Sequence, residues 1–478
     1  MYLTFLPRLM LNYFCHGPNK NPLHMTATTS STIFHFLSFE ATREQAKALY
    51  RLEGFLDPEC GEDVFVLRGA AGTGKTSLVK AVVDFLEGQQ IGCYLTAPTG
   101  RAAKVLGFKT HSLAHTVHHT IYKVIPTDDE RIVMERKVNT QDAYSVFVID
   151  EASMISDNNR ADGNFQTPGS LLFDLLVYVK QGNPANKIIF IGDRYQLAPI
   201  NEAESVALSL NHFMKKYNLT GQQAELTEVK RQEGRSPVLA LAHDIRRKSD
   251  AGNALGKLNV NRLYNFTAGV TRYVNLYDSN GPDNVVMIGS ANKNVNTFNK
   301  LVRDRLGLSG TLAIGDQVIV NENWIDSQNL IVKGETGLVR EIEGCVEKRA
   351  NLEFITAKIE FQDPDHQPLV ITTKVLLDTL KSEKGEIPGE MLRNLKADRM
   401  AKNFDYRANQ HPANDPYMGA MRLRYGHGLT GYKAQGGEWN HVLLHPWFHE
   451  NDYRYAYTAI TRARESVTSW EQSGWWQK

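Results

Sequence analysis

The chain has 478 residues, which is enough for about three domains of roughly 150 residues each. Hydrophobic residues make up 42% and charged residues 22%, a balance typical of a globular protein with sizeable cores. The net charge is +1, from 54 Lys and Arg against 53 Asp and Glu, and this balance neither demands nor excludes a nucleic-acid partner. Any nucleic-acid contact must come from a local groove.

The four cysteines stand far apart and form no C-x-x-C pair, so the sequence predicts neither a zinc site nor a disulfide framework. No apolar run approaches the roughly 20 residues needed to cross a bilayer. The first residues also lack the basic start and apolar run of a secretory signal. These features favour a reducing cytoplasm and no membrane partner. Residues 1–37 are expected to be a poorly ordered tail.

The segment SFEATREQAKAL (residues 38–49) opens the ordered part of the chain and is predicted to contain a helix start. Gln45 follows Thr42 by three positions, which is the spacing of a capping box. Beside a phosphate loop, the donor and acceptor of a Gln amide also suit an adenine edge. Both roles of Gln45 stay open from the sequence, because they coexist only if the side chain points away from the cap.

A phosphate-binding loop follows a short apolar strand predicted at residues 64–67. The segment GAAGTGKT (residues 69–76) matches G-x-x-x-x-G-K-[ST] at every fixed position. The backbone N–H groups of such a loop point inward, and together with the positive end of the next helix they bind phosphate oxygens. Lys75 is predicted to reach the outer phosphates, and Thr76 to offer a hydroxyl to Mg²⁺. The predicted nucleotide contacts are Gly69, Ala71, Gly72, Thr73, Gly74, Lys75, Thr76 and Ser77.

Polar residues follow the carboxyl ends of two further predicted strands. Asp150 and Glu151 follow the apolar run 144–149. A phosphate-loop enzyme needs one carboxylate to hold Mg²⁺ and a second to orient and deprotonate the attacking water, so Asp150 is assigned the first role and Glu151 the second. The strand at residues 187–191 ends in GDRYQLAP, where Gln196 is predicted to bond the γ-phosphate or the attacking water.

Two arginines outside the phosphate-loop domain suit the stabilisation of transition-state charge across a cleft. Arg231 lies in LTEVKRQ (residues 226–232) and Arg462 in YTAITRAR (residues 457–464). Taken singly, an arginine in such a position is more often an ordinary surface cation.

Two turns are predicted to hold a second, polymeric ligand. TAPTGRAAK (residues 96–104) leads from a strand into a helix at the sheet edge where ligands bind in open α/β folds. Pro98, Thr99 and the backbone at Gly100 are its predicted phosphate contacts. His118 would face the same groove, although a lone His is more often a surface residue. In TGYKAQGGE (residues 430–438), backbone phosphates are assigned to Thr430 and Lys433, and the nucleotide cleft to Gly436 and Glu438.

The strand and helix pattern predicts an α/β protein with insertions. Residues 121–143 break the βα rhythm and are expected to form an inserted hairpin. Short strands at residues 338–375 indicate a small barrel, and residues 421–425 are assigned to the second α/β unit. The expected divisions are a first unit at 38–225, a second unit at 226–337 and 416–478, and a barrel with a helical extension at 338–415.

Taken in order, these segments resemble motifs I, Ia, II, III, IV, V and VI of superfamily-one helicases, and SFEATREQ resembles the family's Q motif. The likeness is to the RecD/Dda-like group of superfamily 1B and covers residues 38 to about 467. It implies two RecA-like P-loop motor domains with an inserted β-hairpin pin and an SH3-like small barrel. ATP and Mg²⁺ would bind between the motor domains, with single-stranded DNA across them.

The resemblance also implies roles for individual residues. Lys75, Thr76, Asp150, Glu151 and Gln196 would serve the phosphates, metal and water. Arg231 and Arg462 would be paired arginine fingers, and Gln45 the adenine reader. The DNA-contacting positions would be Pro98, Thr99, Gly100, His118, Asn292, Thr430 and Lys433.

The activity implied by the resemblance is ATP-dependent 5′–3′ movement on single-stranded DNA, with unwinding of forked duplexes in replication, recombination or repair. The expected protein is a monomer in the cytoplasm of a bacterial or phage-infected cell, with a single-strand-binding protein or replisome component as a further partner.

Two features depart from the family pattern. Tyr432 stands where relatives commonly carry His, and the predicted hairpin has no aromatic residue at its tip. An ATP-switched loading protein and an RNA-directed motor stay open as alternatives, whereas the downstream motifs disfavour a nucleotide kinase. A change at Glu151 separates helicase from loader, because only the loader would keep its ATP-bound function.

Overall fold

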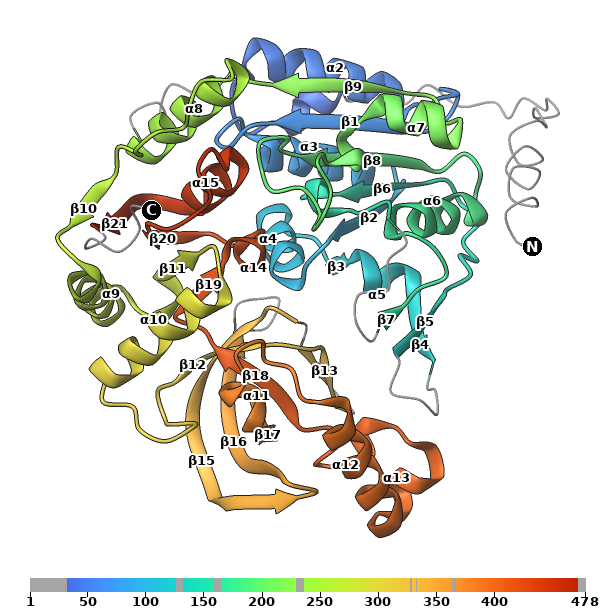
Figure 1. Cartoon of the computed structure of the whole chain (residues 1–478). Helices are drawn as coiled ribbons and strands as arrows, with labels where there is room; N and C mark the ends of the chain where they lie inside the picture. The colour runs from blue at the N-terminus through green and yellow to red at the C-terminus, as the bar shows by residue number, and fades with distance from the viewer. Residues whose placement is uncertain are drawn as a thin grey trace.

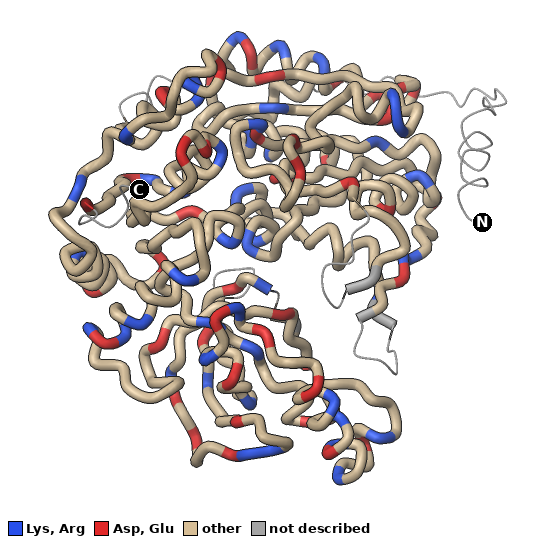
Figure 2. The backbone as a smooth tube through the Cα atoms, viewed as in Figure 1, with Lys and Arg blue, Asp and Glu red and all other residues tan. Residues whose placement is uncertain are grey.

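The computed structural model describes residues 32–125, 132–158, 165–228, 236–326, 329–331, 333–362 and 367–471. Figure 1 shows two α/β units, with a β-barrel below them in this view. Lys and Arg are interspersed with Asp and Glu over all three parts, as the near-zero net charge predicts (Figure 2). Within the described ranges, no helix has the length and apolar character to span a membrane.

The first unit is a six-stranded parallel sheet in the order β3-β2-β6-β8-β1-β9. The central strands are buried on both faces, which explains their continuous apolar runs. The strands are β1 (Val64–Gly69), β2 (Gly92–Ala97), β3 (Ala114–Thr116), β6 (Ser145–Ile149), β8 (Lys187–Gly192) and β9 (Gly221–Leu226).

Helices cover both faces of this sheet and make two separate hydrophobic cores. One core joins α2 (Arg43–Leu56), α3 (Lys75–Gly88) and α4 (Gly100–Thr110) to the sheet. The other joins α5 (Val117–Ile121), α6 (Leu171–Gly182) and α7 (Leu210–Tyr217) to the opposite face. The short 3₁₀ helices η2 (Ala152–Met154) and η3 (Val206–Leu208) follow strand ends on that second face.

The second unit is a five-stranded parallel sheet in the order β10-β21-β20-β11-β19. Its two cores hold α8 and α15 on one face and α9 and α10 on the other. The elements are β10 (Asn261–Leu263), β11 (Val285–Gly289), β19 (Gly428–Thr430), β20 (Trp439–Leu444), β21 (Ala463–Trp470), α8 (Pro237–Asp250), α9 (Phe266–Asn280), α10 (Asn292–Arg305), α14 (Gly431–Ala434) and α15 (Tyr453–Ile460). The predicted α/β class is confirmed, and two such parallel sheets indicate a RecA-like pair.

The barrel is present but larger than predicted. It closes in the order β12-β15-β16-β17-β18, from β12 (Gln317–Val320), β15 (Thr336–Arg349), β16 (Leu352–Gln362), β17 (Pro368–Leu376) and β18 (Met421–Tyr425). Residues 421–425 therefore belong to the barrel and not to the second α/β unit. Met421 and Leu423 pack with Val318 and Val320 in the barrel core. The sequence pattern of residues 421–425 could not assign this strand to its sheet, because a short alternating strand has the same pattern in a barrel and in an α/β sheet.

A helical extension leaves the barrel before β18 and packs against one end of it. It comprises α11 (Asp378–Lys381), α12 (Gly389–Lys402), α13 (Phe404–Asn409) and the 3₁₀ helix η5 (Pro412–Asn414). Leu395 of α12 packs with Leu352, Phe354 and Leu376 of the barrel strands. The short pair β13 (Trp324–Ile325) and β14 (Leu330–Ile331) and the 3₁₀ helix η4 (Pro282–Asn284) complete this region.

The predicted hairpin has two antiparallel strands, β4 (Tyr122–Ile125) and β5 (Ile132–Arg136). A third strand, β7 (Phe165–Gln166), pairs parallel with β5 and was not predicted. Tyr122 donates to Asp174 of α6 at 2.7 Å, and Arg136 pairs with the same carboxylate at 2.6 Å. These contacts fix the strands to the first unit. The predicted tip lies outside the described residues.

The tail predicted at residues 1–37 is wrong for its last part. Residues 1–31 lie outside the described ranges, but η1 (Ile33–Phe36) packs against α2 and α3. Ile33 is fully buried, and the ring of Phe36 lies 6.2 Å from that of Phe85. Two apolar side chains thus dock this segment onto the first unit.

Candidate nucleotide and DNA sites

The phosphate loop joins β1 to α3 and folds around the Lys75 side chain. Gly74 caps α3 with φ +79°, and an added Cβ there would lie 2.6 Å from Gln45 Nε2. Lys75 Nζ donates to the carbonyls of Gly69 at 2.7 Å and Ala70 at 3.0 Å. The loop therefore positions the Lys75 ammonium at its centre, where the predicted phosphates would lie.

Gln45 is held as a cap and not as a free adenine reader. Its Oε1 accepts from the Thr42 N–H at 3.0 Å, which completes the capping box. Its Nε2 donates to the Thr73 carbonyl at 2.8 Å, and the side chain is only 1% exposed. The amide thus ties helix α2 to the phosphate loop. An adenine contact would require it to give up one of these bonds.

Asp150 and Glu151 follow β6, as predicted. Asp150 Oδ1 accepts from the Glu151 N–H at 2.9 Å, and Glu151 has φ +49°, an uncommon value outside glycine. Burial raises the pKa of both carboxyl groups, although Arg462 opposes the shift at Glu151. Thr76 and Asp150 offer the oxygen donors that suit Mg²⁺ when phosphates and water supply the remaining ligands.

The predicted residues Glu151, Gln196 and Arg462 meet at one point between the two units. Arg462 Nη1 lies 3.8 Å from Glu151 Oε1. With its amide oriented to satisfy both neighbours, Gln196 donates to Glu151 Oε2 at 3.2 Å and accepts from Arg462 Nη2 at 3.3 Å. Arg462 is 5% exposed and is held by the carbonyls of Thr458 and Gly437. Arg231, the other predicted arginine finger, lies outside the described residues.

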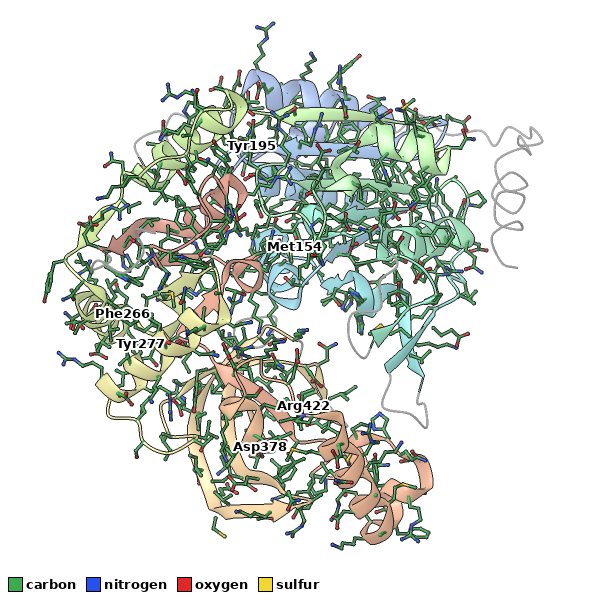
Figure 3. All side chains as sticks on the ribbon, viewed as in Figure 1. Met154, Tyr195, Phe266, Tyr277, Asp378 and Arg422 are labelled. Atoms are coloured by element: carbon green, nitrogen blue, oxygen red, sulfur yellow. The ribbon has the colours of Figure 1, made fainter. Side chains whose placement is uncertain are left out.

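Two hydroxyl groups of α15 join the units and were not identified from the sequence. Tyr457 Oη donates to Asp193 Oδ2 at 2.7 Å and accepts from the Ala71 N–H of the phosphate loop at 2.8 Å. Thr458 Oγ1 accepts from the Leu197 N–H at 2.9 Å. Both residues lie in YTAITRAR, so the motif was found but only its arginine was assigned a role. Figure 3 places Tyr195 at the same boundary.

Gly436 and Glu438 contact α4 of the first unit, and Glu438 also lies close enough to Asp150 to raise the pKa of that carboxyl group. Gly436 has φ +75°, and an added Cβ would lie 2.6 Å from the Ala102 Cβ. Glu438 pairs with Lys109 at 2.9 Å and with Arg464 at 3.0 Å. These residues therefore bridge the units beside the nucleotide residues.

The residues predicted to bind a polymer lie at the starts of helices in both units. Thr99 caps α4, with its side chain accepting from the Ala102 N–H, and Pro98 precedes it. Thr430 stands at the N-cap of α14, which contains Lys433. Asn292 begins α10 and accepts from Arg424 at 3.4 Å. Each follows the carboxyl end of a parallel strand, the usual ligand edge of such sheets.

Cationic groups crowd this second ligand surface. Burial, with Arg424 and Lys333 nearby, lowers the pKa of Lys433 to about 7. Burial and Lys333 lower the pKa of His118 to about 4. Because Lys333 affects both groups, His118 of the first unit and Lys433 of the second lie near one shared cation. A polyanion bound here would relieve the repulsion.

Comparisons with known proteins agree with these motifs. Residues 42–263 match the AAA domain family, and residues 425–468 match the UvrD-like helicase C-terminal domain. The chain is 26% identical over 88% of its length to the ATP-dependent RecD2 DNA helicase of Deinococcus radiodurans, covering 49% of that protein. It is 28% identical over 54% of its length to the ATP-dependent DNA helicase dda of Enterobacteria phage T4, covering 56% of that protein. The chain thus spans about half the length of the curated relatives it matches.

Solved structures with a similar arrangement include Pif1 helicase from Bacteroides with ADP-AlF3 and single-stranded DNA, at 16% identity, a TM-score of 0.48 and coverage of 90% of this chain and 92% of that one. Pif1 helicase from Candida albicans matches at 15% identity, a TM-score of 0.46 and coverage of 91% and 96%. The motifs found along the sequence, together with the family and relative matches, make this chain similar to the helicases of superfamily 1B.

Proposed function

We propose that this protein is an ATP-dependent DNA helicase that moves 5′ to 3′ on single-stranded DNA. The observation that carries the proposal is the contact of α15 and the turn after it with the phosphate-loop unit, through Tyr457 and Thr458 of the helix and Arg462 of the turn. Because one short segment of the second unit meets Glu151, Gln196 and Ala71, we expect a change in the bound nucleotide to change how the two units are held together.

Each residue of the nucleotide site then has a defined task. Lys75 and the loop N–H groups hold the phosphates, and bound Mg²⁺, held by Thr76 and Asp150, would neutralise phosphate charge. Glu151 orients the attacking water and accepts its proton, while Gln196 senses the γ-phosphate. Arg462 stabilises negative charge in the transition state, and we assign the same role to Arg231.

DNA is proposed to lie along the edge formed by Pro98, Thr99, Gly100 and His118 of the first unit and Asn292, Thr430 and Lys433 of the second. Contacts from both units let the grip alternate when the cleft opens and closes. Because these are backbone contacts, binding should tolerate any sequence and weaken in salt. The β4–β5 strands are proposed to form the pin at which a forked duplex separates.

We further propose a cytoplasmic monomer that acts in replication, recombination or repair, alongside a single-strand-binding protein or a replisome component. The direction of movement is taken from the likeness to the RecD/Dda-like group. Sedimentation of the purified protein with and without an oligonucleotide would test whether the protein is a monomer in solution.

The deciding experiment measures strand separation, with ATP and Mg²⁺, on partial duplexes that carry either a 5′ or a 3′ single-stranded tail. Unwinding of only the 5′-tailed substrate, lost in Lys75→Ala, supports the proposal. Unwinding of the 3′-tailed substrate alone would reverse the direction. DNA-stimulated ATP hydrolysis without unwinding of either substrate would favour the loading protein.

A further inference from the structure

A cavity of about 320 Å³ lies between the two α/β units. We call it the arginine pocket. It is lined by Arg68 of β1, by Arg194 and Tyr195 of the turn after β8, and by Arg246 and Asp250 of α8. Arg68 lies on the same face of β1 as the buried Val64 and Val66, which pack against α6 and α7, whereas the phosphate-loop helix α3 packs on the other face. The arginine pocket is therefore distinct from the phosphate loop.

The arginine pocket contains buried donors that the described protein does not satisfy. Four arginines line it, the fourth being Arg454, together with the two carboxylates of Glu204 and Asp250. Glu225, beside the pocket, pairs with Arg194 at 3.2 Å and lies 3.7 Å from Arg68. Arg246 is only 8% exposed, and its guanidinium lies 5.6 Å from the centroid of the Tyr195 ring and near Tyr457, without a carboxylate partner among the described residues. Buried charges normally have a partner, because an unpaired one is costly.

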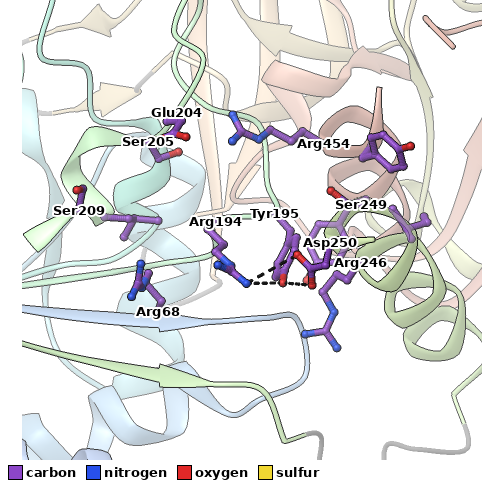
Figure 4. Close-up of a pocket in the computed structure, with 14 residues that line it drawn as sticks. Arg68, Arg194, Tyr195, Glu204, Ser205, Ser209, Arg246, Ser249, Asp250 and Arg454 are labelled. Carbon is purple, nitrogen blue, oxygen red and sulfur yellow. Dashed lines mark hydrogen bonds and ion pairs between the residues drawn. The ribbon is translucent and has the colours of Figure 1, made fainter. Parts of the chain in front are cut away.

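Two further polar atoms in the arginine pocket have the same character. Among the described residues, Arg68 Nε and Ser205 Oγ are buried and find no hydrogen-bond partner. Figure 4 shows Arg68 and Arg194 on the side of the first unit, with Arg246 and Asp250 on α8 across from them. Two unsatisfied groups of the first unit and the largely buried Arg246 guanidinium of the second unit thus converge on one cavity, and an anion would bond to all three.

We propose that the arginine pocket binds a phosphate group, either as free orthophosphate or as the terminal phosphate of a second nucleotide. Guanidinium groups match phosphate oxygens with paired N–H donors. The cavity volume is at the lower end of the roughly 300–1,000 Å³ typical of small-ligand sites. Arg68, Arg246 and Ser205 supply the donors, and Tyr195 supplies a wall.

Occupation of the arginine pocket reaches the catalytic residues through Tyr195. Tyr195 Oη donates to Asp250 Oδ2 at 2.7 Å, and Arg194 Nη2 lies 3.8 Å from the same carboxylate. An anion held by Arg68, Arg246 and Ser205 lies beside Asp250, competes with it for Arg194 and so loosens this link between the units. Because Gln196 follows Tyr195 directly, the rate of ATP hydrolysis should change when phosphate binds. This consequence rests on the proposed function, whereas the binding itself does not.

The test measures binding of ³²P-labelled orthophosphate by equilibrium dialysis in a Lys75→Ala background, which disables the phosphate loop. Arg246→Gln should weaken binding about tenfold, through loss of a charged donor. Ser205→Ala, a smaller change that keeps the fold even where the first variant does not, should weaken it about threefold. Arg247→Gln is the matched control, since this neighbour on α8 is 71% exposed and pairs with Asp244.

A second arm repeats the dialysis with labelled ATP to separate the two sources of phosphate. Tighter retention of ATP than of orthophosphate, lost in Arg246→Gln, assigns the terminal phosphate of a nucleotide, and the reverse assigns orthophosphate. The proposal is overturned if neither probe binds, or if Arg246→Gln and Ser205→Ala bind as well as Arg247→Gln. These measurements involve neither DNA nor hydrolysis, so their failure would leave the helicase proposal standing.

Discussion

The nucleotide side and the DNA side of the cleft differ in how their polar groups are satisfied. On the nucleotide side, Lys75, Gln45 and Tyr457 are fully engaged by other protein atoms. On the DNA side, Lys433 lies near Arg424 and Lys333, and its pKa falls to about 7.

This difference indicates two kinds of ligand response. A nucleotide must replace existing protein–protein bonds, so its binding necessarily rearranges the contacts between the units. DNA meets cations that already repel one another, so its binding should relieve this repulsion.

The largest effect is expected at Lys75. Lys75→Ala should lower kcat for ATP hydrolysis about 100-fold or more, as the loss of a charge-stabilising donor does at other sites. Its affinity for an oligonucleotide in the absence of ATP should not change. Lys80→Ala is the control, because Lys80 lies on the same helix but pairs with Asp84 at the surface. Weakened DNA binding in Lys75→Ala alone would contradict the separation of the two sides.

Tyr457→Phe removes the hydroxyl that joins Ala71 and Asp193, and leaves both groups without this partner. It should lower kcat/KM about tenfold and the free energy of unfolding by about 1–3 kcal/mol, the usual cost of a buried unsatisfied group. Urea denaturation and steady-state ATP hydrolysis measure the two effects.

Tyr455→Phe is the matched control for Tyr457→Phe. Tyr455 lies on the same helix, and its buried hydroxyl makes no hydrogen bond to the described residues. Its loss should therefore be neutral or stabilising. Equal effects of the two substitutions would show that the cross-cleft bonds of Tyr457 do not matter.

The DNA side should respond to pH through Lys433. Its folded-state pKa of about 7 is below the ordinary value of 10.5, so the side chain is charged below about pH 7 and neutral above it. Over the range from 7 to 10.5 the unfolded chain holds a proton that the folded chain has lost, so this group makes stability rise with pH.

DNA affinity should move in the opposite direction. As the pH rises from 6 to 9, fluorescence anisotropy with a labelled oligonucleotide should show up to about tenfold weaker binding, because one charged contact is lost. His118, with a pKa of about 4, is neutral over this range and adds nothing. In Lys433→Arg the charge persists, so the pH dependence should disappear. An unchanged slope in that variant would exclude Lys433 as its source.

The sequence was most informative where the chemistry is local. The phosphate loop, the Asp150–Glu151 pair and the Gln45 capping box each depend on residues close in the chain, and the structure places each as the spacing predicts. Which of two compatible roles Gln45 adopts was not predictable, because its second bond goes to Thr73, 28 residues away.

Long-range partners could not be predicted. Tyr457 contacts Ala71, 386 residues away, and no spacing rule connects them. β18 closes the barrel although about 45 residues of helical extension separate it from β17. Glu438 was placed near the nucleotide, but its partners Lys109 and Arg464 come from two units. In each case the motif was visible, while the contact depended on how two distant segments pack.

The smallest effect is expected at Glu438. Burial alone would raise its pKa, but Lys109 and Arg464 outweigh burial and lower it to about 2. The carboxylate therefore adds stability above about pH 4.5, and the contribution is lost as the pH falls from there toward 2. Because the side chain is about one-third exposed, solvent screening limits the gain, and Glu438→Gln should reduce the free energy of unfolding by only about 1 kcal/mol at pH 7.

Urea denaturation should show that this difference is constant from pH 5 to 7 and shrinks below pH 4.5. The control is Glu465→Gln, whose side chain is 58% exposed and which should match the parent protein throughout. A difference that persisted undiminished in acid would mean that Glu438 stabilises the junction through packing and not through its charge.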